Sequence, residues 1–226
     1  MITSDFDDGV AMLVLDMHER RNALDITACD ALREAFETAL AKGARAIVVT
    51  GQGSCFCAGA DLSGVYDQGF RTALYGMLRT ITAASVPVIA AVNGPAIGAG
   101  TQLAIACDLR VAAQTARFAV PTARKGLAVD PWTVRRLALL AGGGSARALL
   151  IGGETIGAEV AFARGLVDRL GDLPDALAWA REVAAFASQS LAYSKKALES
   201  MFEPRLWDAE LDAAFERCWP DTGATS

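Results

Sequence analysis

Short apolar runs alternate with an amphipathic segment in the first part of the chain. Runs at residues 10–15, 46–50 and 88–92 are bounded by glycine, asparagine or proline and have the length of buried strands. Between the first two, apolar side chains recur at helical spacing over residues 28–40, which predicts an amphipathic helix. Strands that alternate with helices predict an α/β fold.

The alternation continues along the chain. Further elements are predicted as a helix within 70–83, a helix at 101–107, and strands at 108–112 and 117–120. From residue 130 onward the pattern is mainly helical, with one strand-like piece at 166–170. Because no repeat of 20 to 50 residues is visible, periodicity by itself supports the α/β class and nothing finer.

Composition narrows the classes of function. Of the 226 residues, 53% are hydrophobic, which allows a large core, but the longest apolar runs fall far short of the ~18 to 20 residues that cross a bilayer. The N-terminus is acidic and shows no secretory signal, so the cytoplasm is the expected location. The net charge of −5, without a long basic run, argues against nucleic acid as a partner.

The cysteines predict reduced thiols and no metal site. They are odd in number and show no paired spacing: Cys29, Cys55, Cys57, Cys107 and Cys218. The single histidine, His18, is interpreted as a turn residue, and Cys55 and Cys57 have the wrong spacing for a zinc knuckle. The arginines first considered for a polyanionic ligand are Arg20, Arg21, Arg135 and Arg136, for which solvated surface cations are an equally good interpretation.

Four segments, in order over some 200 residues, resemble signatures of the enoyl-CoA hydratase/isomerase (crotonase) superfamily. RRNAL at 20–24 resembles the family's (K/R)RNAL, and VVTGQG at 48–53 with FCAGADL at 56–62 resembles VLTGxGxxFCAGADL. PVIAAVNGPAIGAGTQL at 87–103 resembles PVIAAVNGxAxGGGxEL, and CDLR at 107–110 continues as the family does. Each motif is moderate evidence alone, and the series is strong evidence.

The resemblance implies a fold and a ligand. The expected fold is a spiral of ββα turns, with residues 1–170 forming the core and its CoA-thioester pocket. Residues 171–226 would form a C-terminal helical region, shorter than is usual in the family, that drives assembly into a homotrimer or hexamer. The expected partner is a fatty acyl-CoA or enoyl-CoA, and no cofactor is expected besides that thioester.

The family's shared device is a pair of backbone N–H groups that hold the thioester oxygen. By motif alignment the donors here are Ala60 and Ala99. Preorganised donors in a dry site stabilise an enolate-like charge by ~3 kcal/mol each, and tight turns with small residues let ligand and backbone approach. The family usually has glycine at the position of Ala99. An alanine is harmless there if its φ is negative and strained if its φ is positive.

Both acidic side chains that hydratases of the family use are replaced in this sequence. Hydration needs one group to activate water and another to protonate the neighbouring carbon. The two aligned positions are Gln102 and Thr122, and neither side chain exchanges a proton readily near pH 7. The loss predicts a hydratase rate lower by ~10⁴ or more. The two side chains could bind the acyl group or a water, or could satisfy each other.

Asp130 is the one carboxylate left near this region of the alignment. Some isomerases of the family carry an aspartate at this place as their single proton shuttle, which makes an enoyl-CoA isomerase the second hypothesis. The pattern of Asp130, Pro131 and Trp132 is also typical of an N-cap and a first-turn proline at a helix start. Trp132 could wall the acyl tunnel or pack in the core.

The remaining candidates also rest on the resemblance. Substrate-binding positions carried over from the family motifs are Arg21, Ala23, Leu24, Ala58, Asp61 and Leu62, beside Gln102, Thr122 and Trp132. Lys195 and Lys196 resemble a lysine-bearing helix near the coenzyme A phosphates, although solvated surface side chains are the preferred interpretation. Glutamine, threonine, alanine and tryptophan together resemble an actinobacterial subset that binds acyl-CoA without hydrating it.

Three hypotheses follow. The first is a protein that binds fatty acyl-CoA and has weak or no hydratase activity. The second is an isomerase that uses Asp130. The third is a non-catalytic interaction protein whose vestigial pocket is empty.

Overall fold

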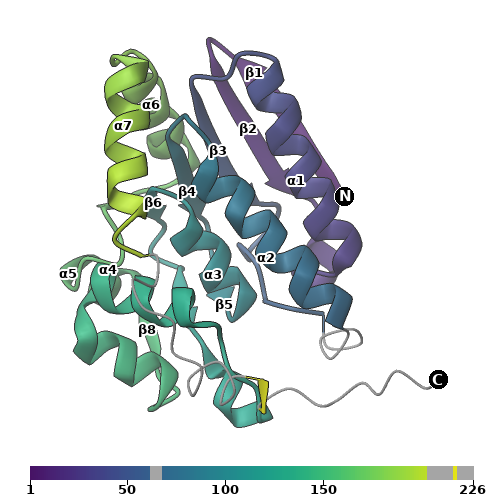
Figure 1. Ribbon diagram of the computed structural model, residues 1–226, viewed down its shortest axis with the longest axis vertical. Helices are drawn as coiled ribbons and strands as arrows, with labels where there is room; N and C mark the ends of the chain where they lie inside the picture. Colours follow the sequence, from purple (N-terminus) through teal and green to yellow (C-terminus); the bar gives the residue numbers. More distant parts are fainter. Residues whose placement is uncertain (62–67, 203–215, 218–226) are drawn as a thin grey trace.

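A six-stranded sheet forms the centre of the molecule (Figure 1). The computed structural model describes residues 1–61, 68–202 and 216–217. The strand order is β1-β2-β3-β4-β6-β9, with β1 antiparallel to β2 and the other neighbours parallel. The strands are β1 Ile2–Asp7, β2 Val10–Leu15, β3 Ala46–Gly51, β4 Val88–Val92, β6 Leu109–Ala112 and β9 Arg169–Leu170.

A second, three-stranded sheet has the order β5-β7-β8. Its strands are β5 Pro95–Ile97, β7 Arg117–Ala119 and β8 Thr155–Gly157. β5 leads directly into the helix α3 (Ala99–Ala106), which starts two residues after the strand ends. The strand therefore fixes where that helix begins.

Helices cover both faces of the main sheet. The helices are α1 Ile26–Ala41, α2 Gln68–Ala83, α3, α4 Pro131–Leu150, α5 Ala158–Ala163, α6 Leu173–Ala184 and α7 Ser188–Glu199, with short 3₁₀ turns η1 His18–Arg20 and η2 Pro121–Lys125. None of the helices in the described ranges is both long and apolar enough to cross a membrane.

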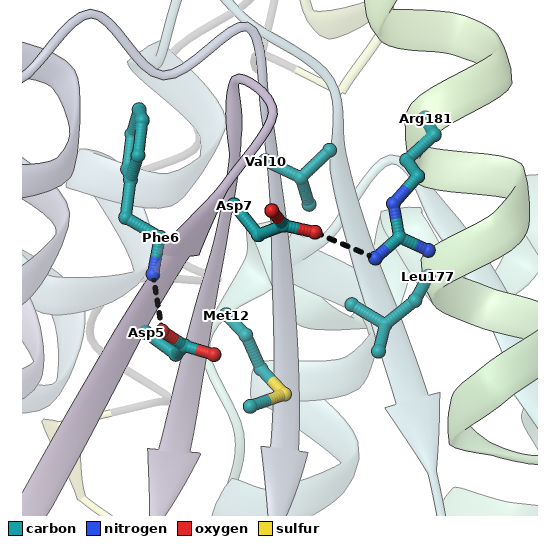
Figure 2. Close-up of a pocket in the computed structure, with 7 residues that line it drawn as sticks. All are labelled: Asp5, Phe6, Asp7, Val10, Met12, Leu177 and Arg181. Carbon is teal, nitrogen blue, oxygen red and sulfur yellow. Dashed lines mark hydrogen bonds and ion pairs between the residues drawn. The ribbon is translucent and has the colours of Figure 1, made fainter.

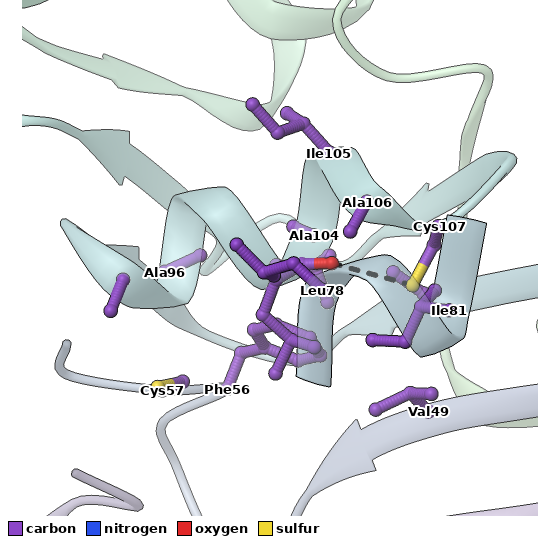
Figure 3. Close-up of a cluster of buried hydrophobic side chains, with 14 of the residues drawn as sticks. Val49, Phe56, Cys57, Leu78, Ile81, Ala96, Ala104, Ile105, Ala106 and Cys107 are labelled. Atoms are coloured by element: carbon purple, nitrogen blue, oxygen red, sulfur yellow. Dashed lines mark hydrogen bonds between the residues drawn. The ribbon is translucent and has the colours of Figure 1, made fainter. Parts of the chain in front are cut away.

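Alternation along the strands explains the two layers. In β3, Ile47 and Val49 join the larger core with α1, α2 and α3, while Ala46 and Val48 face α6. Successive strand residues point to opposite faces, so a strand buried on both sides is apolar throughout. Figure 3 shows part of the larger core, where Val49 lies near side chains of α2 and α3.

The sequence patterns found the buried elements and missed the exposed or short ones. The predicted elements from residue 10 to residue 120 all form with ends within two residues of the expected ones. The strand expected at 166–170 forms only at Arg169–Leu170. β1 was not predicted because all but one of its residues are exposed, and β5 and β8 are only three residues long.

Buried ion pairs attach α7 to the rest of the molecule. Lys195 is 8% exposed, and its ammonium group donates to the carbonyl oxygens of Ile81 and Val86 and to the carboxylate of Asp108, the last at 2.8 Å. The preferred interpretation of Lys195 as a solvated side chain is wrong, because its three donors are directed at three acceptors inside the protein. Lys196 is exposed.

Arg136 on α4 is also buried, at 2% exposure, which overturns its interpretation as a surface cation or a ligand-binding one. It makes two hydrogen bonds of 2.7 Å to the carboxylate of Glu199 on α7 and donates to the carbonyl of Ile105 in α3. The rings of Trp132 and Phe202 lie 5.1 Å and 4.3 Å from its guanidinium carbon. Charge and flat aromatic faces together hold this arginine inside the core.

Candidate functional site

Two segments that are distant in sequence run side by side at the start of the site. Asn22 is buried with φ +56, and its side-chain amide donates to the carbonyls of Gln52 and Cys55 at 3.1 and 2.7 Å. An asparagine tolerates this left-handed conformation better than most residues. The RRNAL segment therefore ties down the loop that leads into the FCAGADL segment.

The pairing of these segments sets the direction of the Ala60 amide. Leu24 donates to the carbonyl of Gly59 at 2.8 Å and accepts from the N–H of Asp61 at 2.7 Å. Ala60 lies between those two residues, so its own N–H points away from Leu24. Within the described residues that N–H has no hydrogen-bond partner.

The Ala99 amide stands at the first position of α3. Its N-cap, Gly98, has φ +54 and ψ −115, a conformation that glycine adopts without a steric penalty. Ala99 is not among the described non-glycine residues with positive φ, so the alanine is unstrained. Its N–H has no partner within the described residues either, as expected for a first-turn donor, and the helix dipole adds positive potential there.

Glycine brings the two amide-bearing segments together. Gly59 has φ +104, and a Cβ on it would lie 2.6 Å from the carbonyl oxygen of Ile97 and 3.7 Å from the nitrogen of Ala99. Any larger residue would push the segments apart. The two amides therefore meet at one cavity because position 59 has no side chain.

The cavity between α2, α3 and η2 has a volume of about 50 Å³. It is lined by Ala60, Phe70, Arg71, Leu74, Tyr75, Ala99, Gln102, Thr122, Leu127, Ala128 and Val129. Four residues named from the sequence, Ala60, Ala99, Gln102 and Thr122, are therefore brought together. The α2 residues were missed because their apolar spacing indicated only a core-facing helix.

Other predicted residues lie beside the cavity without lining it. Ala58 is held by a 3.0 Å hydrogen bond to the carbonyl of Arg21, and Asp61 pairs with Arg20 at 3.1 Å. Ala23 is half-buried and Leu24 is fully buried. Leu62 lies outside the described residues.

Gln102 is bonded to groups other than Thr122. Its side-chain nitrogen donates to the hydroxyl of Thr133 at 2.8 Å and to the carboxylate of Asp130 at 3.2 Å. The idea that Gln102 and Thr122 satisfy each other is therefore wrong. The amide nitrogen is engaged by Thr133 and Asp130, and Thr122 lies at the cavity wall.

Asp130 caps α4. It accepts from the backbone N–H of Thr133 at 3.1 Å and from its hydroxyl at 2.6 Å, and Pro131 occupies the first helical position. This is the capping arrangement that the sequence offered as the alternative to a proton shuttle. Asp130 does not line the cavity, and its carboxylate accepts from Thr133 and Gln102 and also interacts with the hydroxyl of Tyr75.

Trp132 does not line the cavity among the described residues. Its ring lies over the guanidinium of Arg136, 5.1 Å away, and packs against the core. Of the two alternatives for Trp132, the structure shows core packing, because the ring lies over Arg136 and not at the wall of this cavity.

Two further cavity residues carry polar groups. Burial raises the pKa of the Tyr75 hydroxyl, and the charge of Asp130 raises it further, so the hydroxyl stays protonated at neutral pH. Arg71 is 13% exposed and forms a 3.0 Å ion pair with Glu216. The cavity therefore combines an apolar wall with neutral donors and acceptors and one paired cation.

A larger hollow of about 300 Å³ lies elsewhere, between the β1–β2 hairpin and α6. Figure 2 shows its wall, where Asp7 and Arg181 form a 3.0 Å ion pair across it. Both side chains of this pair are largely exposed. None of the sequence motifs contributes to this hollow beyond the strand Val10–Leu15.

Comparison with known proteins gives a consistent result. The enoyl-CoA hydratase/isomerase family pattern matches residues 5–215. A protein named "Probable enoyl-CoA hydratase echA6" from Mycobacterium bovis is 44% identical over 214 residues, covering 94% of this chain and 84% of that protein. Its counterpart from Mycobacterium leprae is 43% identical over 219 residues, covering 95% and 84%.

Solved structures agree with the sequence relatives. An enoyl-CoA hydratase/isomerase from Pseudoalteromonas atlantica superposes with a TM-score of 0.83 at 28% identity, covering 96% of this chain and 87% of that one. An enoyl-CoA hydratase/carnithine racemase from Magnetospirillum magneticum superposes with a TM-score of 0.82 at 27% identity, covering 97% and 88%.

Proposed function

Because the chain belongs to the enoyl-CoA hydratase/isomerase (crotonase) superfamily, we propose that it binds fatty acyl-CoA thioesters and has weak or no hydratase activity. The observation that carries this proposal is the pair of amides at one cavity. The N–H groups of Ala60 and Ala99 have no partner within the described residues, and both residues line the cavity. Two such donors fit a carbonyl oxygen.

The chemistry of the cavity wall supports binding more than hydration. Gln102 and Thr122 occupy the places where an acid and a base would be needed, and neither exchanges a proton near pH 7. Among the described residues that line the cavity there is no aspartate or glutamate. A bound thioester would be polarised there without a group to deliver water.

A one-base isomerase that uses Asp130 is less well supported. The carboxylate accepts three hydrogen bonds, two from Thr133 and one from Gln102, and it caps α4. Those donors occupy the carboxylate oxygens, and Asp130 is not one of the described residues that line the cavity. If Asp130→Asn abolished conversion of a 3-enoyl to a 2-enoyl thioester in a wild-type chain that catalyses it, the isomerase would replace the present proposal.

Calorimetry and a hydration assay test the proposal directly. Titration with long-chain and short-chain acyl-CoAs is expected to show binding at micromolar concentration. Incubation with an enoyl-CoA is expected to produce no measurable hydroxyacyl-CoA. Hydration at the rate of an ordinary hydratase contradicts the second part, and absence of binding by every thioester contradicts the first and favours an interaction protein with an empty pocket.

Ala99→Pro tests the amide itself. The first position of a helix tolerates proline because its N–H has no partner within the helix, so this change removes one donor and keeps α3. A lost hydrogen bond of ~0.5–1.5 kcal/mol corresponds to a roughly threefold to tenfold weaker affinity for butyryl-CoA. Free coenzyme A, which has no thioester carbonyl, is the control ligand, and equal losses for both ligands contradict the assigned role.

Self-association in the cytoplasm as a trimer or hexamer is part of the same proposal. Large apolar side chains are exposed on α4, α5 and α7: Val134, Leu139, Val160, Phe162, Tyr193 and Leu198. Covering such groups is a common basis of homo-oligomers. Light scattering after size exclusion tests this part, and a monomer at micromolar concentration contradicts it.

A further inference from the structure

Arg71 is the one charged side chain among the described residues that line the cavity. It extends from α2, and its side chain is 13% exposed. Arg71 and Tyr75 are four residues apart on that helix, so both face the same side of it. The rest of the described wall consists of apolar side chains and of the neutral polar groups of Tyr75, Gln102 and Thr122. The cavity therefore has one place that favours a negative charge.

A carboxylate from a distant part of the chain occupies this place. The guanidinium of Arg71 forms a 3.0 Å ion pair with Glu216, which lies 145 residues further along the sequence. The side chain of Glu216 is 60% exposed, so water solvates its charge well even without the arginine. Exposed carboxylates of this kind contribute little to stability through their ion pairs. A ligand carboxylate can therefore replace Glu216 without a large loss elsewhere.

The ion pair lies close to the other polar groups of the cavity. Burial and the charge of Asp130 are the main causes of the raised pKa of the Tyr75 hydroxyl, and the charges of Arg71 and Glu216 act on it as well. Asp130 does not line the cavity, and its carboxylate accepts hydrogen bonds from side chains on α2, α3 and α4. Its negative charge is therefore matched by its own donors, and Arg71 remains the cation of this wall.

An unsubstituted acyl chain makes no use of this cation. Aliphatic carbon beside a guanidinium removes water from it and returns no hydrogen bond, which is unfavourable. A terminal carboxylate matches the planar fork of an arginine and can bind it through two parallel hydrogen bonds.

The size of the cavity limits the length of such a ligand. Its volume of about 50 Å³ holds about four groups the size of a water molecule, at roughly 10–15 Å³ for each. A carboxylate at Arg71 would therefore lie only a few atoms away from a thioester carbonyl at the amides of Ala60 and Ala99.

We propose that the cavity binds the thioester of a short dicarboxylic acid, whose free carboxylate pairs with Arg71 in place of Glu216. The inference rests on the proposed function, because the amides of Ala60 and Ala99 hold the thioester carbonyl of the same ligand. Arg71 is the specificity-determining residue. Glu216 is an internal competitor that occupies Arg71 while the cavity is empty. Binding involves no covalent step.

The test compares diacid thioesters with plain thioesters of the same carbon number by calorimetry on the full chain. Malonyl-, succinyl- and glutaryl-CoA are measured against propionyl-, butyryl- and pentanoyl-CoA. At the length that fits, the diacid is expected to bind the wild-type protein about tenfold more tightly than its plain counterpart, because a hydrogen bond between charged groups contributes more than a neutral one.

Two substitutions are expected to act in opposite directions. Arg71→Met removes the cation, so the affinity ratio of diacid to plain thioester should fall to one or below. Glu216→Gln removes the competing charge, so the affinity for the diacid should rise about threefold while that for the plain thioester stays unchanged. Arg79→Met, which removes an exposed arginine from the same helix, is the matched control and keeps the ratio.

The outcomes separate this inference from the proposed function. Equal affinities for diacid and plain thioesters at all three lengths in the wild type, or an unchanged ratio in Arg71→Met, overturn the inference alone. If Arg71→Met weakens binding of free coenzyme A as much as that of the diacid, Arg71 binds a phosphate of the coenzyme and the inference fails. Absence of binding by all six thioesters overturns the proposed function and this inference with it. If Arg71→Met does not fold, as judged by circular dichroism, Glu216→Gln decides, because it changes an exposed side chain.

Discussion

Gly100 lies directly against the carbonyl of Cys57. A Cβ at position 100 would be 2.2 Å from that oxygen and 2.9 Å from the carbonyl carbon, closer than real Cβ atoms come. The contact joins the first turn of α3 to the FCAGADL segment, and it keeps the Ala99 amide at its place. Backbone atoms on both sides leave no flexible side chain to move away.

Gly100→Ala is therefore expected to destabilise the protein by a few kcal/mol, since overpacking typically costs about 1–3 kcal/mol and here it meets backbone. Acyl-CoA binding should weaken as well. Urea unfolding measures the first effect and calorimetry the second. The matched control is Gly76→Ala in α2, where nothing lies within 4 Å of the added methyl, and a gain of up to ~1 kcal/mol is expected. Equal stability of the two variants would contradict the close contact.

Lys195 and Lys196 form a natural pair for comparison. Lys195→Met leaves the Asp108 carboxylate without its cation at 2.8 Å, and loss of one partner of a buried pair costs about 3–5 kcal/mol. Lys196→Met changes an exposed side chain of the same helix and should alter the unfolding free energy by less than about 0.5 kcal/mol. Denaturant unfolding of both variants checks the prediction, which fails if the two changes cost the same.

The Arg136–Glu199 pair predicts a strong coupling between α4 and α7. Glu199→Ala leaves the buried guanidinium without its carboxylate and should cost about 3–5 kcal/mol. Adding Arg136→Met should recover part of that loss, because the apolar chain no longer buries a charge. A double-mutant cycle measures the coupling free energy. The exposed pair Arg33–Glu37 is the control cycle and should give less than about 0.5 kcal/mol.

The burial of three cysteine thiols predicts how slowly they are alkylated and how the stability of the protein depends on pH. Burial raises the pKa of Cys29, Cys57 and Cys107 from 9.0 to about 12. At pH 8 only about one molecule in 10⁴ carries a given thiolate, so native protein should resist alkylation at these positions and react after unfolding. Mass spectrometry of peptides after brief iodoacetamide treatment checks this, and rapid native labelling of these three sites contradicts it.

The raised thiol pKa values also predict that the protein loses stability at high pH. The folded state holds these three protons more tightly than the unfolded chain, whose thiols ionise near their ordinary value of 9.0. Their contribution is constant below pH 8 and is lost as the pH rises above 9. At pH 10 each thiol should lower the unfolding free energy by on the order of 1 kcal/mol. Denaturation midpoints at pH 8 and pH 10 measure this loss.

Much of the fold was accessible from local patterns. Strands such as Val10–Leu15 and Val88–Val92 are buried on both faces, so their apolar runs are visible without any knowledge of neighbours. Asp130 and Pro131 predict the start of α4 from the sequence alone. The first N–H groups of any helix have no partner within the helix, so a capping side chain and a first-turn proline are favoured there. The motif series also indicated Ala60 and Ala99, because the glycines around them are needed for close approach.

The tertiary structure decided what the polar side chains do. Lys195 looks like any surface lysine in the sequence, and only the fold brings Ile81, Val86 and Asp108 around it. The sequence named both Gln102 and Asp130 as site candidates, but it did not show that the Gln102 amide donates to Asp130 and Thr133 at the start of another helix. Hydrophobic spacing and capping act over a few residues and leave a pattern in the chain, whereas these bonds join segments that meet only after the sheet and helices have packed.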